Sequence, residues 1–329
     1  MRRTVSAVAS GTNLAGWTGP EVIAACRAAY NVYRRAKTES YRAYFAANPQ
    51  LKANDHAYKA KDLEAALPDG WGGLATQLPR SERHRHCLSG NSSQILALGL
   101  LGAGAKLDPW LNWLWNALGP IPPAAGQLPD VRFEYTLKPQ VLDERPRQTS
   151  IDFWASDSAV LLCVEAKWTE AGIGACGCGK AAAAIGNCAE KVRKRSAYSS
   201  TAKNAFALPD RRDGKPCPLS FTYQAVRNVA ASQALAGPGR DAVFGLIYDA
   251  ENPYFAGCGS WPGWPVALHA TLDEAGSPVR FASVSWQELL PLLPLDQPAA
   301  AWASAKHGLH RATSEPGRAY RRSLRWTIL

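Results

Sequence analysis

The stretch from Thr149 to Glu170, TSIDFWASDSAVLLCVEAKWTE, constrains the fold of this chain more than any other. Two apolar runs rich in β-forming residues, Ile151–Trp154 and Val160–Val164, flank a Ser-Asp-Ser sequence that has the composition of a turn. Runs of this length bounded by a turn are typical of paired strands. The stretch therefore predicts a β-hairpin in the interior of the protein.

The register of this hairpin brings three charged side chains together. If the chain turns about Ser158 and Ala159, counting back places Asp152 directly opposite Glu165, with Cβ atoms roughly 5 Å apart. Side chains alternate along a strand, so Lys167 lies on the same face as Glu165. Two facing carboxylates repel each other unless a cation such as Mg²⁺ lies between them, and a nearby lysine can stabilise charge on a phosphate. The structural alternative is a chance E-x-K match at a solvated strand end, but unpaired charges in so apolar a hairpin are costly unless they have a function.

These residues resemble the signature of the PD-(D/E)xK nuclease superfamily. Ser150-Ile151-Asp152 stands where the family often has Pro-Asp, and Glu165-Ala166-Lys167 ends the next strand. The resemblance extends from Ser81 to Leu290 and is closest to a bacterial subgroup of restriction-endonuclease-like proteins. The pieces that match this subgroup in order are Arg85-His86, Ser92-Ser93-Gln94, Arg132-Phe133-Glu134-Tyr135, Tyr223-Gln224 and Arg227-Asn228.

The resemblance implies a mixed α/β fold with the αβββαβ core of restriction endonucleases, and metal-dependent cleavage of nucleic-acid phosphodiesters. It implies that Asp152, Glu165 and the Ala166 carbonyl bind Mg²⁺ or Mn²⁺, that Lys167 stabilises the charge formed in the reaction, and that Gln224 supports the site. Much of the superfamily adds a carboxylate from the first helix. Glu82 is the candidate here, although it lies before that helix.

Charge points to the same class of partner. The net charge of +10 favours a polyanion, nucleic acid first and an anionic membrane second, although arginine-rich chains are also basic without a specific partner. We expect phosphate contacts from three basic groups, for which solvated surface is the alternative. They are Arg145 and Arg147 before the hairpin, Lys191, Arg193, Lys194 and Arg195 after it, and Arg227 on a later helix.

Apolar runs in the sequence stay short of the roughly 18 residues that a membrane span needs, so we expect no membrane span and a cytoplasmic protein. Four cysteines, at positions 176, 178, 188 and 217, suggest a zinc or iron–sulfur site. Their spacing differs from that of nuclease relatives with such clusters, and reduced cysteines are the interpretation we favour.

The sequence predicts three segments along the chain. These are a helical N-terminal region over 1–79, a nuclease-like core over 80–295 with a Cys/Gly/basic insertion at about 172–216, and a basic C-terminal tail over 296–329. The tail, which includes Lys306 and His307, is interpreted as a DNA-binding arm, and a loosely ordered tail is the alternative. Patterns predict helices over Pro20–Ala47, Lys61–Ala66, Ser92–Leu101, Asp108–Leu118 and Phe221–Leu235, and further strands over Val131–Leu137, Asp241–Asp249 and Val279–Val284.

The hypothesis is therefore a metal-dependent DNA endonuclease of restriction, defence or repair type. Two alternatives are a catalytically silent nucleic-acid-binding module and a subunit of a defence or repair complex, which the tryptophan-rich segment Asp108–Leu118 could serve. DNA against RNA, internal against terminal cutting, and monomer against homodimer stay open.

Overall fold

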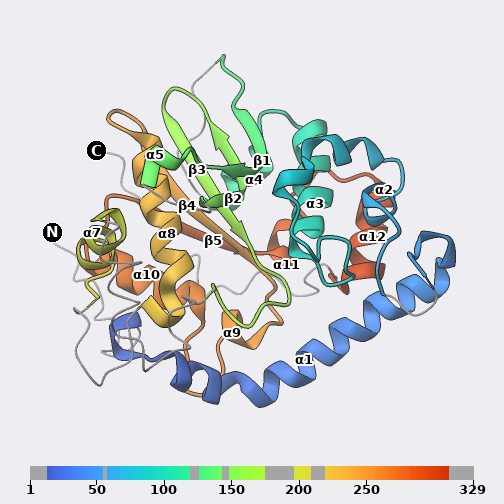
Figure 1. Cartoon of the computed structure of the whole chain (residues 1–329), viewed down its shortest axis with the longest axis horizontal. Coiled ribbons are helices and arrows are strands. Elements are labelled where there is room, and N and C mark those ends of the chain that lie inside the picture. The colour runs from blue at the N-terminus through green and yellow to red at the C-terminus, as the bar shows by residue number, and fades with distance from the viewer. Residues whose placement is uncertain are drawn as a thin grey trace, which may run out of the picture.

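The centre of the protein is a five-stranded mixed sheet. The computed structural model describes residues 13–54, 58–118, 126–142, 148–174, 196–208 and 219–310. The strands are β1 (Asp130–Thr136), β2 (Ser150–Ser156), β3 (Val160–Ala166), β4 (Asp241–Tyr248) and β5 (Arg280–Ser285), and they lie side by side in sequence order. β1, β2 and β3 are antiparallel neighbours, whereas β3, β4 and β5 are parallel (Figure 1).

Helices occupy most of the remaining described chain. They are α1 (Gly19–Ala47), α2 (Leu63–Ala66), α3 (Ser93–Leu107), α4 (Asn112–Leu118), α5 (Pro139–Leu142), α7 (Ser196–Asn204), α8 (Leu219–Ala236), α9 (Pro253–Ala256), α10 (Trp264–Glu274), α11 (Trp286–Leu289) and α12 (Gln297–His307). Short 3-10 helices lie at η1 (Leu14–Gly16), η2 (Pro49–Leu51), η3 (Gly72–Gln77) and η4 (Arg80–Glu82). The order α3, β1, β2, β3, α8, β4 confirms the predicted αβββαβ core.

Local sequence explains where these elements begin. The Asp157 carboxylate accepts hydrogen bonds from the Ala159 and Val160 amides, both at 2.8 Å, and so closes the β2–β3 turn. Ser92 caps α3 by accepting a hydrogen bond from the Ile95 amide at 3.2 Å. Ser285 and Glu288 form a capping box at the start of α11.

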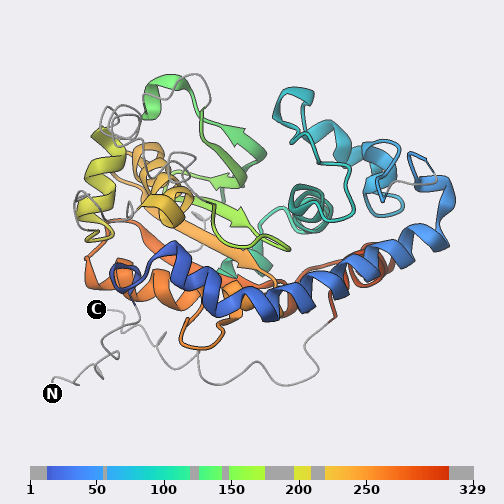
Figure 2. The same ribbon diagram turned by 60° about the horizontal axis from the view of Figure 1, so that its bottom comes forward.

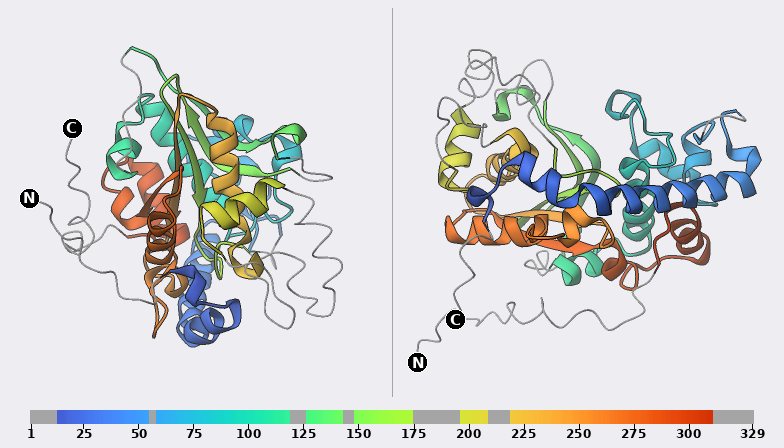
Figure 3. Two further views of the ribbon diagram at one scale, coloured as in Figure 1. Left: turned by 90° about the vertical axis from the view of Figure 1, so that its left-hand side faces the viewer. Right: turned by 90° about the horizontal axis from the view of Figure 1, so that it is seen from below.

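Helices cover both faces of the sheet, and each face has its own apolar core. Every residue of β3 is buried, as expected for a strand covered on both sides. On one face, residues of α3, α4, α11 and α12 pack against alternate side chains of the strands, including Phe153 and Val164. On the other face, α8 and α10 pack against Trp154 and Cys163. Figure 3 shows the sheet edge-on between these two groups of helices.

The long helix α1 runs along one side of the molecule and joins the two cores. At 1.5 Å per residue its 29 residues span about 43 Å. Val22 and Cys26 near its start belong to the core under α8, whereas Phe45 near its end belongs to the core under α3. Figure 2 shows α1 passing beneath the sheet and continuing along α12.

The C-terminal segment contains a helix where the sequence suggested a DNA-binding arm. Lys306 and His307 lie in α12 with 1% and 0% of their surfaces exposed, because α12 packs against α1 and α3. Lys306 donates to the Ala66 carbonyl at 2.7 Å, and the His307 ring lies between Trp168 and Trp302. The prediction that these two residues contact DNA is therefore wrong, and residues 311–329 lie outside the described part of the chain.

Candidate active site

The facing carboxylates lie at one end of the β2–β3 hairpin. Extended by one step, the observed pairing of Phe153 with Val164 places Asp152 opposite Glu165, which is the register that the sequence predicted. An Asp152 oxygen, Oδ2, accepts a hydrogen bond from the Ala166 amide at 2.8 Å. Among the described residues, no hydrogen bond reaches its other oxygen, Oδ1. Asp152 is therefore fixed in position with one oxygen still available.

Glu165 is the most buried acid of the site, with 1% of its surface exposed. Its Oε1 lies 2.6 Å from the Lys167 ammonium and accepts a hydrogen bond from the Gln224 amide at 2.6 Å. Its Oε2 accepts from the Asn228 amide at 2.5 Å. Lys167, which is 7% exposed, also donates a hydrogen bond to the side-chain oxygen Oε1 of Gln224 at 3.2 Å. The two α8 side chains sit one helical turn apart and so hold both oxygens of this carboxylate.

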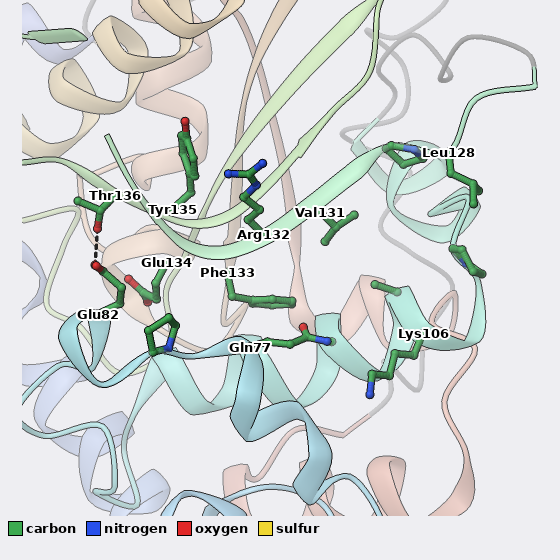
Figure 4. A pocket seen from close by; sticks show the side chains of 15 residues that line it. Gln77, Glu82, Lys106, Leu128, Val131, Arg132, Phe133, Glu134, Tyr135 and Thr136 are labelled. Carbon is green, nitrogen blue, oxygen red and sulfur yellow. Dashed lines mark hydrogen bonds between the residues drawn. The ribbon is translucent and has the colours of Figure 1, made fainter. Parts of the chain in front are cut away.

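Two further acids reach the site from β1 and from η4. Glu134 on β1 lies between Phe133 and Tyr135, which pair with Phe153 and Ile151 of β2, so it falls beside Asp152. The Glu134, Asp152 and Glu165 carboxylates thus stand in a row across three strands and act on one another. Ser150 donates to Glu134 at 3.0 Å. Glu82 in η4 accepts a hydrogen bond from the Thr136 hydroxyl, as Figure 4 shows.

Gln94 ties these segments together. Its amide nitrogen donates to the Glu82 carbonyl at 3.0 Å, and its oxygen accepts from the His84 amide at 3.1 Å. It also hydrogen-bonds the Glu134 side chain. The polar residue at the first turn of α3 thus positions the acids of η4 and β1.

Burial and mutual repulsion disfavour the charged form of Asp152. Burial raises the pKa of its carboxyl well above the ordinary value, and the carboxylates of Glu165 and Glu134 raise it further. Lys167 and the Ala166 amide oppose this rise. A site in which carboxylates repel one another in this way favours a cation among them.

Glu134 and Lys167 respond to the same crowding. Burial raises the pKa of Glu134 to about 7; hydrogen bonds from Gln94 and Ser150 oppose the rise, and nearby carboxylates add to it. For Lys167, burial by itself would lower the pKa, but three carboxylates, with Glu165 first among them, raise it above its ordinary value. Lys167 therefore stays charged in the interior.

The backbone of β1 is bent at Glu134. Its φ is +48°, a left-handed conformation that costs on the order of 1 kcal/mol for a residue with a side chain. Phe133 packs into the core under α3, whereas Tyr135 packs into the core under α8 and stacks on Trp154 at 5.0 Å. The strict alternation expected of a strand is therefore broken at this residue, which leaves Glu134 on the same side of β1 as Glu82 (Figure 4).

The segment after Lys167 is held from beneath. The Trp286 indole donates to the Lys167 carbonyl at 3.0 Å. The Trp168 carbonyl accepts from the Tyr33 hydroxyl at 2.7 Å and from the Asn252 amide at 3.0 Å. Tyr33 of α1 is thus buried, and its hydrogen bond holds the backbone that follows β3.

The donor set suits a hard divalent cation. Among the described residues no group of three or more His, Cys, Asp or Glu side chains is arranged to hold a metal ion by itself. Mg²⁺, however, is commonly bound by one or two carboxylates together with waters and substrate phosphates. The free Asp152 oxygen, the Glu165 carboxylate and the backbone at the end of β3 offer oxygen ligands of this kind.

The structure brings together five of the predicted site residues, which are Asp152, Glu165, Ala166, Lys167 and Gln224. Of the expected phosphate contacts, the structure describes Arg227. Arg227 lies on α8 with its guanidinium 5.8 Å from the Tyr223 ring, and its buried Nε has no hydrogen-bond partner among the described residues. The remaining predicted contacts lie outside the described residues. These are Arg145, Arg147, Lys191, Arg193, Lys194 and Arg195, together with the four cysteines at 176, 178, 188 and 217.

Sequence reasoning gave no role to Glu134, Gln94 or Asn228. Glu134 follows Phe133 in the matched strand motif, and Asn228 lies one turn after Gln224 on a predicted helix. The helical spacing could have identified Asn228 as a second ligand to the same carboxylate. The position of Glu134 depends on the bend in β1, for which the sequence carries no comparable signal.

Residues 34–306 match the model of a family described as Restriction Endonuclease associating with ARP. Neither a curated protein nor a solved structure matches the chain. None of the helices in the described part of the chain has the length and apolar character needed to cross a membrane.

Proposed function

Because the chain belongs to the family of restriction endonucleases associating with ARP, we propose that it is a nuclease that hydrolyses DNA phosphodiester bonds with Mg²⁺ or Mn²⁺. The observation that carries this proposal is the grouping of Asp152, Glu165 and Lys167 at one strand end, with Gln224 and Asn228 fixing the central carboxylate.

In this proposal Asp152 and Glu165 hold the metal, with the Ala166 carbonyl as a further ligand. A bound Mg²⁺ would supply Lewis-acid activation of water and of the phosphate. The Lys167 ammonium would donate hydrogen bonds to a phosphate oxygen and so stabilise the negative charge that develops there in the transition state. Its pKa, raised by the surrounding carboxylates, keeps it charged for this role.

Gln224 and Asn228 position these groups. Their amides hold the Glu165 carboxylate in one rotamer. The Gln224 side chain also accepts a hydrogen bond from the Lys167 ammonium, so this one side chain contacts both Glu165 and Lys167. A fixed arrangement of this kind lowers the reorganisation needed when substrate binds.

The family description names an association with ARP, and we propose that the chain works with a partner in DNA defence. A nuclease that needs this partner would bind DNA alone and cut only in its presence. The exposed indole of Trp110, with 38% of its surface accessible, is one apolar group available for such a contact.

The test is cleavage of plasmid and linear DNA with Mg²⁺ or Mn²⁺ by wild type, Asp152→Asn and Lys167→Ala. Lys61→Ala is the matched control, because this lysine is exposed. We expect metal-dependent cutting that falls by at least about a hundredfold in both site variants and is unchanged in the control. Cutting at the wild-type rate by Asp152→Asn would contradict the proposal, and the products distinguish internal from terminal cleavage.

A further inference from the structure

A groove with a volume of about 730 Å³ runs along β1 beside the candidate active site. One wall is formed by η3 and η4, the other by the end of α3, and β1 forms the floor. Glu82 and Glu134 line the groove, and Glu134 also belongs to the row of acids that includes Asp152. Any occupant of the groove therefore lies next to the proposed metal site.

The middle of the groove is apolar. Figure 4 shows Phe133 and Val131 on the side of β1 that faces Gln77. Arg132 and Tyr135 also border the groove, but their side chains extend away from Gln77. Ala105 on α3 completes the lining. Duplex backbones are bound by surfaces rich in cations, so this lining does not suit a duplex phosphate backbone. A flat aromatic base between apolar walls with one amide at hand suits it well.

Charge changes along the groove. Acids stand at the end next to the metal site, and Lys106 borders the lining at the end of α3. A nucleotide likewise combines a base, which packs well against apolar walls, with a phosphate, which is stabilised by a cation such as Lys106. The volume lies within the range of roughly 300–1,000 Å³ that small-ligand sites occupy.

We propose that this groove binds an unpaired nucleotide of the substrate strand beside the phosphodiester that is cleaved. The inference rests on the proposed function, since the acids at the mouth of the groove are those of the nuclease site. It implies that the substrate is single-stranded or locally opened next to the cut.

The test is binding of a fluorescent oligo-dT single strand, measured by anisotropy with Ca²⁺ in place of Mg²⁺ so that the strand stays intact. Ala105→Trp fills the groove, and Leu107→Trp is its matched control, because Leu107 lies on the same helix with 48% exposure and outside the lining. We expect Ala105→Trp to weaken binding about tenfold, the value of one lost base contact, and Leu107→Trp to bind as wild type does.

A second variant keeps the test valid if Ala105→Trp does not fold. Lys106→Gln changes an exposed residue in the last turn of α3 and should weaken binding a few-fold with a shallower salt dependence. Lys61→Gln should change neither. Circular dichroism and thermal unfolding report whether each variant is folded.

Wild-type affinity in both Ala105→Trp and Lys106→Gln would overturn the inference, as would a wild-type protein that does not bind the strand. Binding of free thymidine monophosphate without any binding of the strand would also overturn it. Duplex cleavage measured in parallel separates the two proposals. If the protein cuts DNA with metal but the groove variants bind the strand as wild type does, the nuclease proposal holds and the groove inference fails. If the groove variants weaken binding but no form of the protein cuts DNA, the groove inference holds and the nuclease proposal fails.

Discussion

Replacing Asp152 by asparagine should stabilise the protein while it removes activity. Asparagine has the same shape and keeps an oxygen that can accept the hydrogen bond from the Ala166 amide. It removes a charge that burial and the carboxylates of Glu165 and Glu134 disfavour. Acidic sites that bind metals often trade stability for function in this way.

The expected size follows from the register. Two unit charges about 5 Å apart repel by about 3 kcal/mol at an effective dielectric constant of about 20. Lys167 offsets part of this repulsion, which leaves a net gain of about 1–2 kcal/mol in the free energy of unfolding. For a chain of this length that gain corresponds to a rise in Tm of about 1.5–3 °C.

The sign depends on pH. The folded-state pKa of Asp152 lies above its unfolded value, so the folded state holds the proton more tightly and loses stability as pH rises above the unfolded pKa of 3.8. The difference between wild type and Asp152→Asn should therefore be small near pH 4 and largest at pH 8.

The assay is thermal unfolding at low salt with a chelator, repeated with Mg²⁺. We expect Asp152→Asn to melt higher than wild type at pH 8 without metal and to lose most of the stabilisation that Mg²⁺ gives wild type. Asp241→Asn is the control, because Asp241 lies exposed at the start of β4 and should change stability by no more than about 0.5 kcal/mol. A lower Tm for Asp152→Asn at pH 8 without metal would refute the electrostatic reasoning.

Three further changes test other residues of the site and a buried ion pair between α1 and the end of β4. Glu134→Gln should raise the free energy of unfolding at pH 8 by about 3 kcal/mol and leave it nearly unchanged near pH 4.5, since the pKa of Glu134 rises to about 7 on folding; equal effects at both values, measured by urea unfolding, would speak against this. Asn228→Ala should lower the free energy of unfolding by about 1–3 kcal/mol and reduce the cleavage rate, because Glu165 loses a buried donor; cleavage at the wild-type rate would remove Asn228 from the site. Lys37→Ala should cost about 3 kcal/mol, because it leaves the fully buried Asp249 without its cation at 2.9 Å, and a Tm within 2 °C of wild type would contradict this.

Contacts between residues close together in the sequence could be predicted, whereas contacts between distant segments could not. The hairpin register is set by a short turn and by alternation on either side of it, so Asp152, Glu165 and Lys167 could be related correctly from the sequence. The order of strands and helices in the core followed from hydrophobic patterns for the same reason. Lys306 and His307 were misjudged because their charge suggested solvent, whereas α12 packs between α1 and α3.

The sequence by itself determined the hairpin, its facing carboxylates and the family to which they point. Only the tertiary structure decided which side chains complete the site. The bond from Gln224 to Glu165 joins residues 59 positions apart, and that from Thr136 to Glu82 joins residues 54 apart. Contacts of this kind depend on how a helix docks on the sheet and on a bend at one strand residue, and both are set by packing over the whole molecule rather than by any local pattern.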